Sequence, residues 1–176
     1  MKQHPADRLW QRRPVSSGAY RPWLCDRGSL TARITERCAD FSVRVVFQGL
    51  RRANRDERFL FARRRRVLVR DVVLYCETTP VVFAHTIVDP AELDGPWRAV
   101  ARLGTRPLGA ALFAEPRVAR HPLRQKKLGP HHDLQRHIRA VLPRVPAALW
   151  ARRSLFRLHD SPILVTEVFL PEILAL

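Results

Sequence analysis

Hydrophobic and polar positions follow one another along the first half of the chain in patterns that predict three strands. In residues 41–50 (FSVRVVFQGL) hydrophobic side chains fall mainly on alternate positions, which is typical of a strand with one face in water. Residues 66–76 (RVLVRDVVLYC) are β-branched and apolar on both faces, as expected of a central strand. Residues 80–88 (PVVFAHTIV) follow after a short link, so we expect the last two strands to form an antiparallel hairpin.

The second half of the chain combines helical periodicity with two further strand-like runs. Residues 90–104 and 132–142 have hydrophobic side chains at three- and four-residue spacing, which predicts amphipathic helices. Residues 107–115 predict a short helix with a proline at its first position. Residues 154–160 and 162–170 have the composition of strands. These elements predict an α+β fold, a single domain with a mainly antiparallel sheet that helices cover on at least one face.

Length and terminal composition indicate one soluble domain. We expect residues 21–176 to form it, preceded by a flexible arm of residues 1–20 in which Trp10 and Tyr20 are able to pack against the domain. No apolar run approaches the ~20 residues needed to cross a bilayer. The positive N-terminus lacks the apolar stretch of a secretory signal. We therefore expect a cytoplasmic protein without stable membrane insertion.

The charge of the chain is strongly positive. The formal net charge is +16, and all but three of the 32 basic residues are arginines. A field of this sign attracts nucleic acid, anionic lipid or a small acidic metabolite, and charge alone does not choose among them. The run RRRR (63–66) could contact phosphate, but it enters a predicted strand, where a solvated edge is the simpler interpretation. Few aromatic residues accompany it, so the stacking platform of a single-strand binder is missing.

The cysteines and histidines show no metal-site spacing. Cys25, Cys38 and Cys76 are odd in number and widely separated, and we expect them to be free thiols in a reducing compartment. Four histidines lie in a basic, proline-bounded stretch without a paired Cys/His or HExxH pattern, so a surface loop is favoured over a metal site. These histidines are His121, His131, His132 and His137.

Arg70 interrupts the hydrophobic pattern of the predicted central strand, on the same face as Val72 and Leu74. A buried guanidinium must be paired, because an isolated charge is costly in a medium of low dielectric constant. Its planar fork suits a carboxylate bound through two parallel hydrogen bonds. That carboxylate belongs either to a protein acid in a structural salt bridge or to a ligand. The neighbouring Asp71 points to the opposite face and is poorly placed to serve.

Glu167 interrupts the last predicted strand in the same way, between Val165 and Phe169. A buried glutamate is either neutralised by a partner or suited to proton transfer. Arg70 and Glu167 could be each other's partner in the core. Alternatively, both could line one cavity, with the arginine binding an anionic ligand and the glutamate a hydroxyl group or a proton. Spacing does not separate these alternatives.

Five segments occur in an order that is itself informative. They are WLCDRGSLTARI (23–34), VLVRDVVL (67–74), FAHTIV (83–88), LGTRPLGAALF (103–113) and LWARRSLFRLHDSPILVTEVFLP (149–171). Together they resemble the chorismate pyruvate-lyase family, bacterial enzymes that open ubiquinone synthesis. The resemblance covers the chain from Trp23 to Pro171, and the last segment is its most specific part.

The resemblance implies a chorismate lyase-like fold, in which an antiparallel sheet and helical flaps enclose an internal ligand cavity. It implies that an arginine on a central strand, here Arg70, binds the ligand carboxylate and that a terminal-strand glutamate, here Glu167, holds the ligand hydroxyl. Backbone groups of the S-L-T turn and the P-L-G loop would complete the site at Leu30 and Leu108. Leu30 replaces the usual methionine. Residues 117–148, where flaps are expected, are longer and more basic than in the family.

The activity implied is the elimination of pyruvate from chorismate to give 4-hydroxybenzoate, the first committed step of ubiquinone biosynthesis. Because the ring becomes aromatic, the reaction has its own driving force, and we expect no metal or other cofactor. Arg70 and Glu167 would be the catalytic residues. The expected partners are the small molecules chorismate and 4-hydroxybenzoate, without a specific nucleic acid, and we expect a monomer.

Two functions from other classes remain open. One is a non-catalytic module that binds a small aromatic acid, because the effector domains of a large class of bacterial transcription regulators are similar in fold to chorismate lyases. The other is a basic nucleic-acid-binding protein, indicated only by the net charge, which would bind with a steep dependence on salt.

Overall fold

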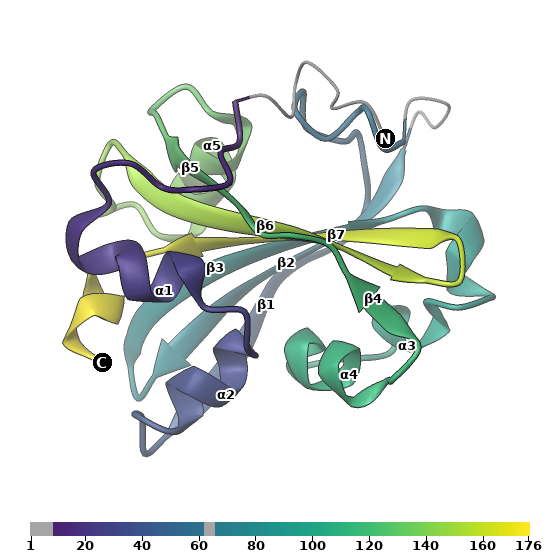
Figure 1. The fold of residues 1–176 in the computed structure, drawn as a ribbon, viewed down its shortest axis with the longest axis horizontal. Coiled ribbons are helices and arrows are strands. Elements are labelled where there is room, and N and C mark those ends of the chain that lie inside the picture. Colours follow the sequence, from purple (N-terminus) through teal and green to yellow (C-terminus); the bar gives the residue numbers. More distant parts are fainter. Residues whose placement is uncertain (1–8, 62–65) are drawn as a thin grey trace.

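One antiparallel β-sheet organises the chain (Figure 1). The computed structural model describes residues 9–61 and 66–176. The seven strands are β1 (Phe41–Arg51), β2 (Val67–Cys76), β3 (Thr79–Val88), β4 (Val118–Arg120), β5 (Arg124–Leu128), β6 (Leu149–Leu158) and β7 (Ser161–Phe169). Their order in the sheet is β1-β2-β3-β7-β6-β4, and β5 also pairs with β6. The antiparallel sheet confirms the predicted fold class.

Short helices cover this sheet. The α-helices are α1 (Arg21–Cys25), α2 (Leu30–Thr35), α3 (Arg98–Ala101), α4 (Leu108–Ala114) and α5 (Asp133–Val141). The 3-10 helices are η2 (Gly18–Tyr20), η3 (Pro90–Leu93) and η4 (Pro171–Ala175). Within the described part of the chain, no helix is long and apolar enough to span a membrane.

Alternation along β2 gives the sheet two distinct faces. Side chains at even positions of β2, among them Arg70, point to one face, and those at odd positions, among them Asp71, point to the other. We call these the Arg70 face and the Asp71 face. Helices α1 to α4 pack on the Arg70 face, whereas α5 and Trp10 pack on the Asp71 face. Figure 1 shows α2, α3 and α4 on one side of the sheet and α5 on the other.

The predicted strands and two of the three predicted helices are confirmed. The predicted helix over 90–104 is wrong, because the segment forms η3 and α3 with Gly95 and Pro96 between them. A proline disfavours helical backbone at the residue before it, and glycine is a weak helix former. Helices α1 and α2 and strands β4 and β5 were not predicted, since each is at most six residues long.

The described part of the N-terminal segment, residues 9–20, is attached to the domain at two points. Trp10 is buried, and its indole Nε1 donates a 2.7 Å hydrogen bond to Asp56. Gln11 forms a backbone bridge to Gln125 on β5. Trp10 therefore packs against the domain, as the sequence allowed, and the flexibility of the arm stays a prediction. The domain boundary at residue 20 stays a prediction.

The cysteine prediction is wrong for two of the three residues. Cys38 and Cys76 form a disulfide, whereas Cys25 is free and exposed. Antiparallel pairing of β1 with β2 places Phe41 opposite Cys76, which brings the two cysteines to a Cα–Cα distance of 5.6 Å. Their separation of 38 residues forms no local motif, so only the strand pairing could have revealed them.

We predict that Cys38→Ser lowers the free energy of unfolding by about 2–4 kcal/mol, because the disulfide restricts the unfolded chain. Urea denaturation of the parent and the variant, with and without reductant, measures this. Cys25→Ser is the matched control and should leave the parent's sensitivity to reductant unchanged. Three reactive thiols in the unfolded, unreduced parent would show that the disulfide does not form.

Candidate functional site

A cavity of about 50 Å³ lies between the Arg70 face of the sheet and helices α2 and α4. This is several times the ~10–15 Å³ that one water molecule requires. All four site residues predicted from the sequence line it: Leu30, Arg70, Leu108 and Glu167. Most of the remaining lining is apolar and comes from the sheet and α4, including Val72, Leu74, Leu112, Phe156 and Val165. The structure thus brings together in one hollow residues that lie far apart in the sequence.

Arg70 lies in the middle of β2 and is 2% exposed. Its Nη2 donates to the backbone carbonyl oxygens of Gly104 at 2.9 Å and Arg106 at 3.2 Å. Its buried Nε–H has no acceptor within the described chain, and no carboxylate there pairs with it. Burial lowers the pKa of Arg70, yet an arginine remains charged in a protein. Among residues 9–61 and 66–176, Arg70 forms neither a structural salt bridge nor a direct pair with Glu167, so the guanidinium keeps capacity for an anion.

The loop that receives the Arg70 hydrogen bonds depends on one glycine. Gly104 has a φ of +55°, in the left-handed region that glycine adopts without a steric penalty. This conformation follows α3 and turns the chain toward α4. The carbonyl groups of Gly104 and Arg106 thereby reach the guanidinium on β2.

Glu167 lies on β7, and its carboxylate is paired with Arg152. Glu167 and Arg152 are opposite each other in the β6–β7 register, and Arg152 Nε donates to Glu167 Oε2 at 2.5 Å. Arg152 is fully buried, and its Nη1 also donates to the carbonyl oxygens of Trp23 and Asp26. Within the described chain, Glu167 Oε1 accepts no hydrogen bond, so it can receive one from a ligand. Sequence reasoning missed Arg152 as the partner, although it lies in the last of the five segments that carry the family resemblance.

Leu30 and Leu108 are the first residues of α2 and α4. The first backbone N–H groups of a helix have no acceptor within the helix, so they are available to a ligand. Gly109 lets the two helices meet above the cavity, because a Cβ there would lie 3.3 Å from Thr31 Oγ1. The cover over the cavity therefore comes from α2 and α4. The expectation that residues 117–148 supply the flaps is wrong, since they form β4, β5 and α5.

A second arginine, Arg120, also lines the cavity and was not predicted. It lies on β4, a strand of three residues that is too short to show a hydrophobic pattern. Its Nε donates to Ser154 Oγ at 2.9 Å, and its guanidinium lies over the rings of Phe113 and Phe156. The lining thus contains two guanidinium groups and one carboxylate, and that carboxylate is already paired with Arg152. This balance favours a small anionic ligand.

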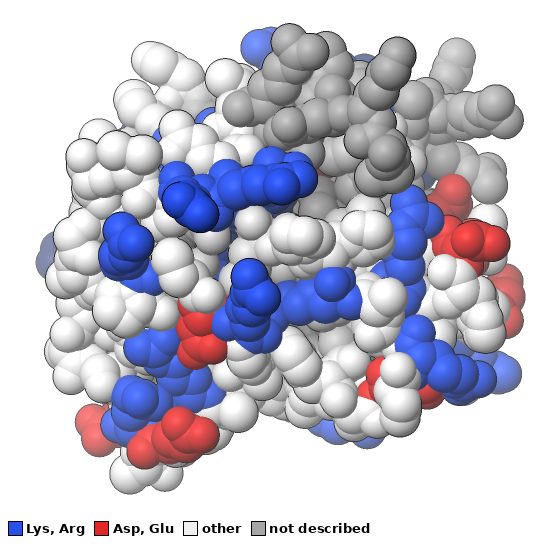
Figure 2. All heavy atoms as spheres, in the orientation of Figure 1, with Lys and Arg blue, Asp and Glu red and all other residues white. Residues whose placement is uncertain are grey.

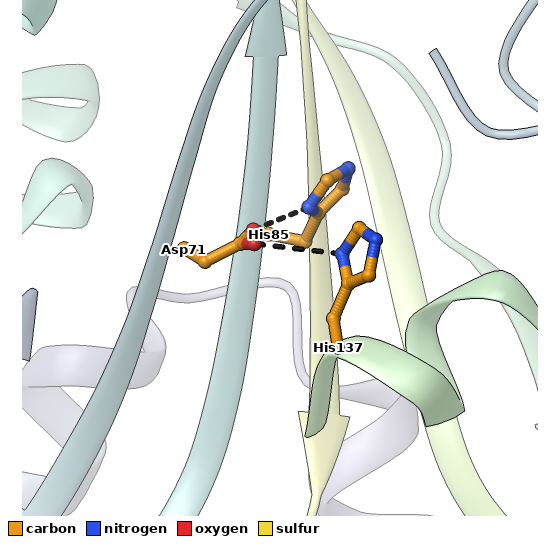
Figure 3. A group of neighbouring side chains, drawn as sticks. All are labelled: Asp71, His85 and His137. Carbon is orange, nitrogen blue, oxygen red and sulfur yellow. Dashed lines mark hydrogen bonds and ion pairs between the residues drawn. The ribbon is translucent and has the colours of Figure 1, made fainter. Parts of the chain in front are cut away.

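A separate polar cluster lies on the Asp71 face, away from the cavity (Figure 3). His85 is placed between two carboxylates, with Nδ1 2.5 Å from Asp71 Oδ1 and Nε2 3.2 Å from Glu57 Oε1. On α5, His137 Nδ1 is 3.5 Å from Asp71 Oδ2, and Arg51 Nη1 is 3.9 Å from it. The predicted surface loop is therefore wrong for His137, which belongs to a helix and contacts a buried acid.

This cluster contains the donor types of a metal site. One ligand atom each from Asp71, His85 and His137 lies within 4.8 Å of the others. The proton of His85 Nδ1 is, however, used in the short contact with Asp71, whereas a metal ligand must offer a free lone pair. We therefore interpret the cluster as an ion-paired network that ties α5 and the segment around Glu57 to the sheet. Residues 63–65 of the RRRR run lie outside the described chain, so the interpretation of the run stays a prediction.

Comparison with known proteins identifies relatives along nearly the whole chain. A family model described as "Chorismate lyase" matches residues 4–175. A probable chorismate pyruvate-lyase of Nitrosomonas europaea is 51% identical over 167 residues, covering 93% of this chain and 94% of the relative. A protein of the same name from Azoarcus is 45% identical over 183 residues, covering 99% and 97%.

Solved structures share the fold at low sequence identity. The effector domain of PhnF from Mycobacterium smegmatis aligns with a TM-score of 0.52 at 12% identity, covering 91% of this chain and 93% of that one. A GntR-family transcriptional regulator from Bacillus cereus aligns with a TM-score of 0.52 at 14% identity, covering 75% and 92%. At this identity the likeness concerns the fold alone.

We predict that the cluster around His85 makes stability depend on pH in the alkaline range. Burial opposes protonation of His85, but the charges of Glu57 and Asp71 outweigh it and raise the pKa to about 10. The folded-state pKa thus exceeds the ordinary value of about 6.5, so the stabilisation is complete below about pH 6.5 and disappears as the pH rises through about 10.

The measurement is urea denaturation of the parent and of His85→Gln at pH 6.5, 8 and 9.5. The parent should lose on the order of 3–4 kcal/mol more than the variant across this interval. Arg51 and His137 also face Asp71 and remain in place in the variant. Arg139→Gln removes an exposed charge from α5 and is the control for a change in net charge alone. Equal pH slopes for the parent and His85→Gln would contradict the assignment.

Proposed function

The chain belongs to the chorismate lyase family and is a carbon–oxygen lyase, and we propose that it converts chorismate to 4-hydroxybenzoate and pyruvate in the cavity beneath α2 and α4. We further propose that this is the first committed step of ubiquinone synthesis, carried out by a monomer in the cytoplasm. One observation supports the site assignment most strongly. Arg70 offers a buried guanidinium without a carboxylate partner in the described chain, in the same cavity as the Glu167 carboxylate.

The two polar groups match the two ends of the product. 4-Hydroxybenzoate has a carboxylate and a hydroxyl at opposite positions of an aromatic ring. In the proposal Arg70 binds the ring carboxylate, and Glu167 Oε1 accepts the hydrogen bond of the hydroxyl group. Backbone N–H groups at Leu30 and Leu108 add donors from the cover. The apolar side chains between these groups contact the ring.

The reaction balances without an external oxidant or reductant. The C–O bond of the enolpyruvyl ether breaks, and the hydroxyl-bearing ring carbon loses its hydrogen as a proton. The ring gains its third double bond, and a proton is added to the methylene carbon of the released enolpyruvate to give pyruvate. The protein therefore has to hold the reactive conformer and exclude water, which a covered apolar cavity with fixed polar groups can do.

The positive charge supports this function only in a general way. On the face shown in Figure 2, basic side chains form several separate groups with uncharged surface between them, and acidic side chains adjoin some of them. Such a surface attracts a dianionic substrate. The distribution on this face does not favour nucleic-acid binding over the small-molecule function.

The function is tested by following 4-hydroxybenzoate and pyruvate from chorismate with purified protein. We expect equal amounts of both products. Arg70→Ala should weaken binding of 4-hydroxybenzoate by about 2–5 kcal/mol, because it removes one partner of a buried charge pair. Arg139→Ala, on the exposed side of α5, is the control for net charge. Circular dichroism establishes that each variant is folded. Arg70→Lys keeps the positive charge but lacks the planar guanidinium, so it shows whether charge alone is enough to bind the carboxylate.

Two results would contradict parts of the proposal. A folded Arg70→Ala variant that binds 4-hydroxybenzoate as tightly as the parent would remove the anchor assignment. A parent that binds 4-hydroxybenzoate without turning over chorismate would instead be a non-catalytic binding module of the same fold.

We predict that Glu167→Gln lowers kcat by about 10²–10⁴-fold, the usual range for loss of an acid–base group. The amide retains the shape and a hydrogen-bond acceptor but gives up the charge that pairs with Arg152. Initial rates at saturating chorismate, together with the pH profile of kcat, measure the effect. A turnover close to that of the parent would leave Glu167 a positioning role only.

A further inference from the structure

Arg120 lies where the enclosed cavity adjoins an outer groove. Both hollows are lined by Arg120 and Phe113. The outer groove is also lined by Arg12, Arg13, Arg21 and Arg27, and none of the described residues that line it is acidic. The guanidinium of Arg120 therefore stands between the cavity and a strongly basic surface, where an anion that enters or leaves would pass it.

Neutral groups hold this guanidinium in place. Nε donates to Ser154 Oγ, and Nη1 donates to the carbonyl oxygen of Arg27 at 2.5 Å and to that of Gly28 at 3.3 Å. Phe113 and Phe156 contribute their rings at centroid distances of 5.3 and 5.2 Å. No carboxylate of the described chain forms a salt bridge with Arg120, so its charge is positioned but not paired.

The strand order places Arg120 across the cavity from Arg70. Along the sheet, β2 with Arg70 is followed by β3, then β7 with Glu167, then β6 with Ser154, and finally β4 with Arg120. Because Ser154 and Glu167 lie on adjacent strands, the Arg120 guanidinium is on the Glu167 side of the cavity. In the strand register Arg70 lies opposite Thr86, which is opposite Val165, which is opposite Ser154, whereas Glu167 is two residues further along β7. Arg120, held by Ser154, therefore lies to one side of the line from Arg70 to Glu167.

The polar groups of chorismate have a matching arrangement, with the second carboxylate to one side of the line from the ring carboxylate to the hydroxyl. Its ring carboxylate is opposite the hydroxyl group, and the enolpyruvyl ether, which carries the second carboxylate, is on the carbon next to the hydroxyl-bearing one. If Arg70 binds the ring carboxylate and Glu167 the hydroxyl, the enolpyruvyl group leaves the line between them at the carbon next to the hydroxyl. In one of the two orientations of the ring face, the second carboxylate then points sideways toward Arg120.

We infer that Arg120 is a substrate-specificity residue that binds the carboxylate of the enolpyruvyl side chain. This inference rests on the proposed function. Because 4-hydroxybenzoate has no second carboxylate, Arg120 contributes to binding of the substrate and not of the aromatic product. Arg70, in contrast, contributes to binding of both.

The test compares the two ligands in Arg120→Gln, Arg120→Lys and the parent. Loss of one charge-assisted contact should raise KM for chorismate about 10–100-fold in Arg120→Gln. The Kd of 4-hydroxybenzoate should stay within about twofold, as expected when no contact to that ligand is removed. Arg120→Lys restores the charge and should recover part of the KM. Arg139→Gln, with the same charge change on exposed α5, should leave both constants unchanged.

The outcomes separate this inference from the proposed function. An Arg120→Gln variant that weakens both ligands equally, or neither, overturns it while the lyase activity of the parent stands. A parent without turnover overturns the proposed function. In that case the Kd of chorismate is measured by titration in place of KM. A variant that loses affinity for chorismate but not for 4-hydroxybenzoate would still support the second anion site. If Arg120→Gln does not fold, Ser154→Ala, which removes the acceptor of Arg120 Nε, must weaken chorismate alone for the inference to survive.

Discussion

The fully buried guanidinium of Arg152 joins strand β6 to strand β7 and to helix α1. It pairs with Glu167 across β6 and β7 and donates to the carbonyl groups of Trp23 and Asp26, in the last turn and at the C-cap of α1. Removing one partner of such a buried pair leaves an uncompensated charge, which is far costlier than the net gain of forming the pair. The position of Glu167 in the cavity and the position of the N-terminal helices on the sheet are therefore consequences of the same side chain.

Successive side chains of a strand point to opposite faces, so one buried sheet can carry charged groups on both of its faces. Arg70 and Asp71 are neighbours in sequence, yet the first contributes to the ligand cavity and the second to the network with His85. Each side must satisfy its charge separately. On the Asp71 face His85, His137 and Arg51 surround the Asp71 carboxylate, which supports a structural role for that network. On the Arg70 face the guanidinium has only carbonyl acceptors in the described chain, which leaves room for a ligand.

Strands and charged residues that break a hydrophobic pattern could be predicted from the sequence, because both are local signals. Arg70 and Glu167 stood out for this reason, and family resemblance added Leu30 and Leu108 to the same cavity. Arg152, Arg120 and the Cys38–Cys76 disulfide were missed because their significance arises from strand pairing across long separations. The short helices α1 and α2 were missed because packing against the sheet, rather than their own periodicity, stabilises them.

The hydrogen bonds of Arg70 to Gly104 and Arg106 have a thermodynamic consequence for access to the cavity. They tie the loop before α4 to the sheet, and each bond from a charged donor is worth about 1.5–3 kcal/mol. Opening that segment gives up these bonds, so an open conformation is a minor population, on the order of 1% or less if about 2.7 kcal/mol is lost. The same guanidinium that faces the ligand cavity thus also contributes to the free-energy difference between the closed and open positions of this loop.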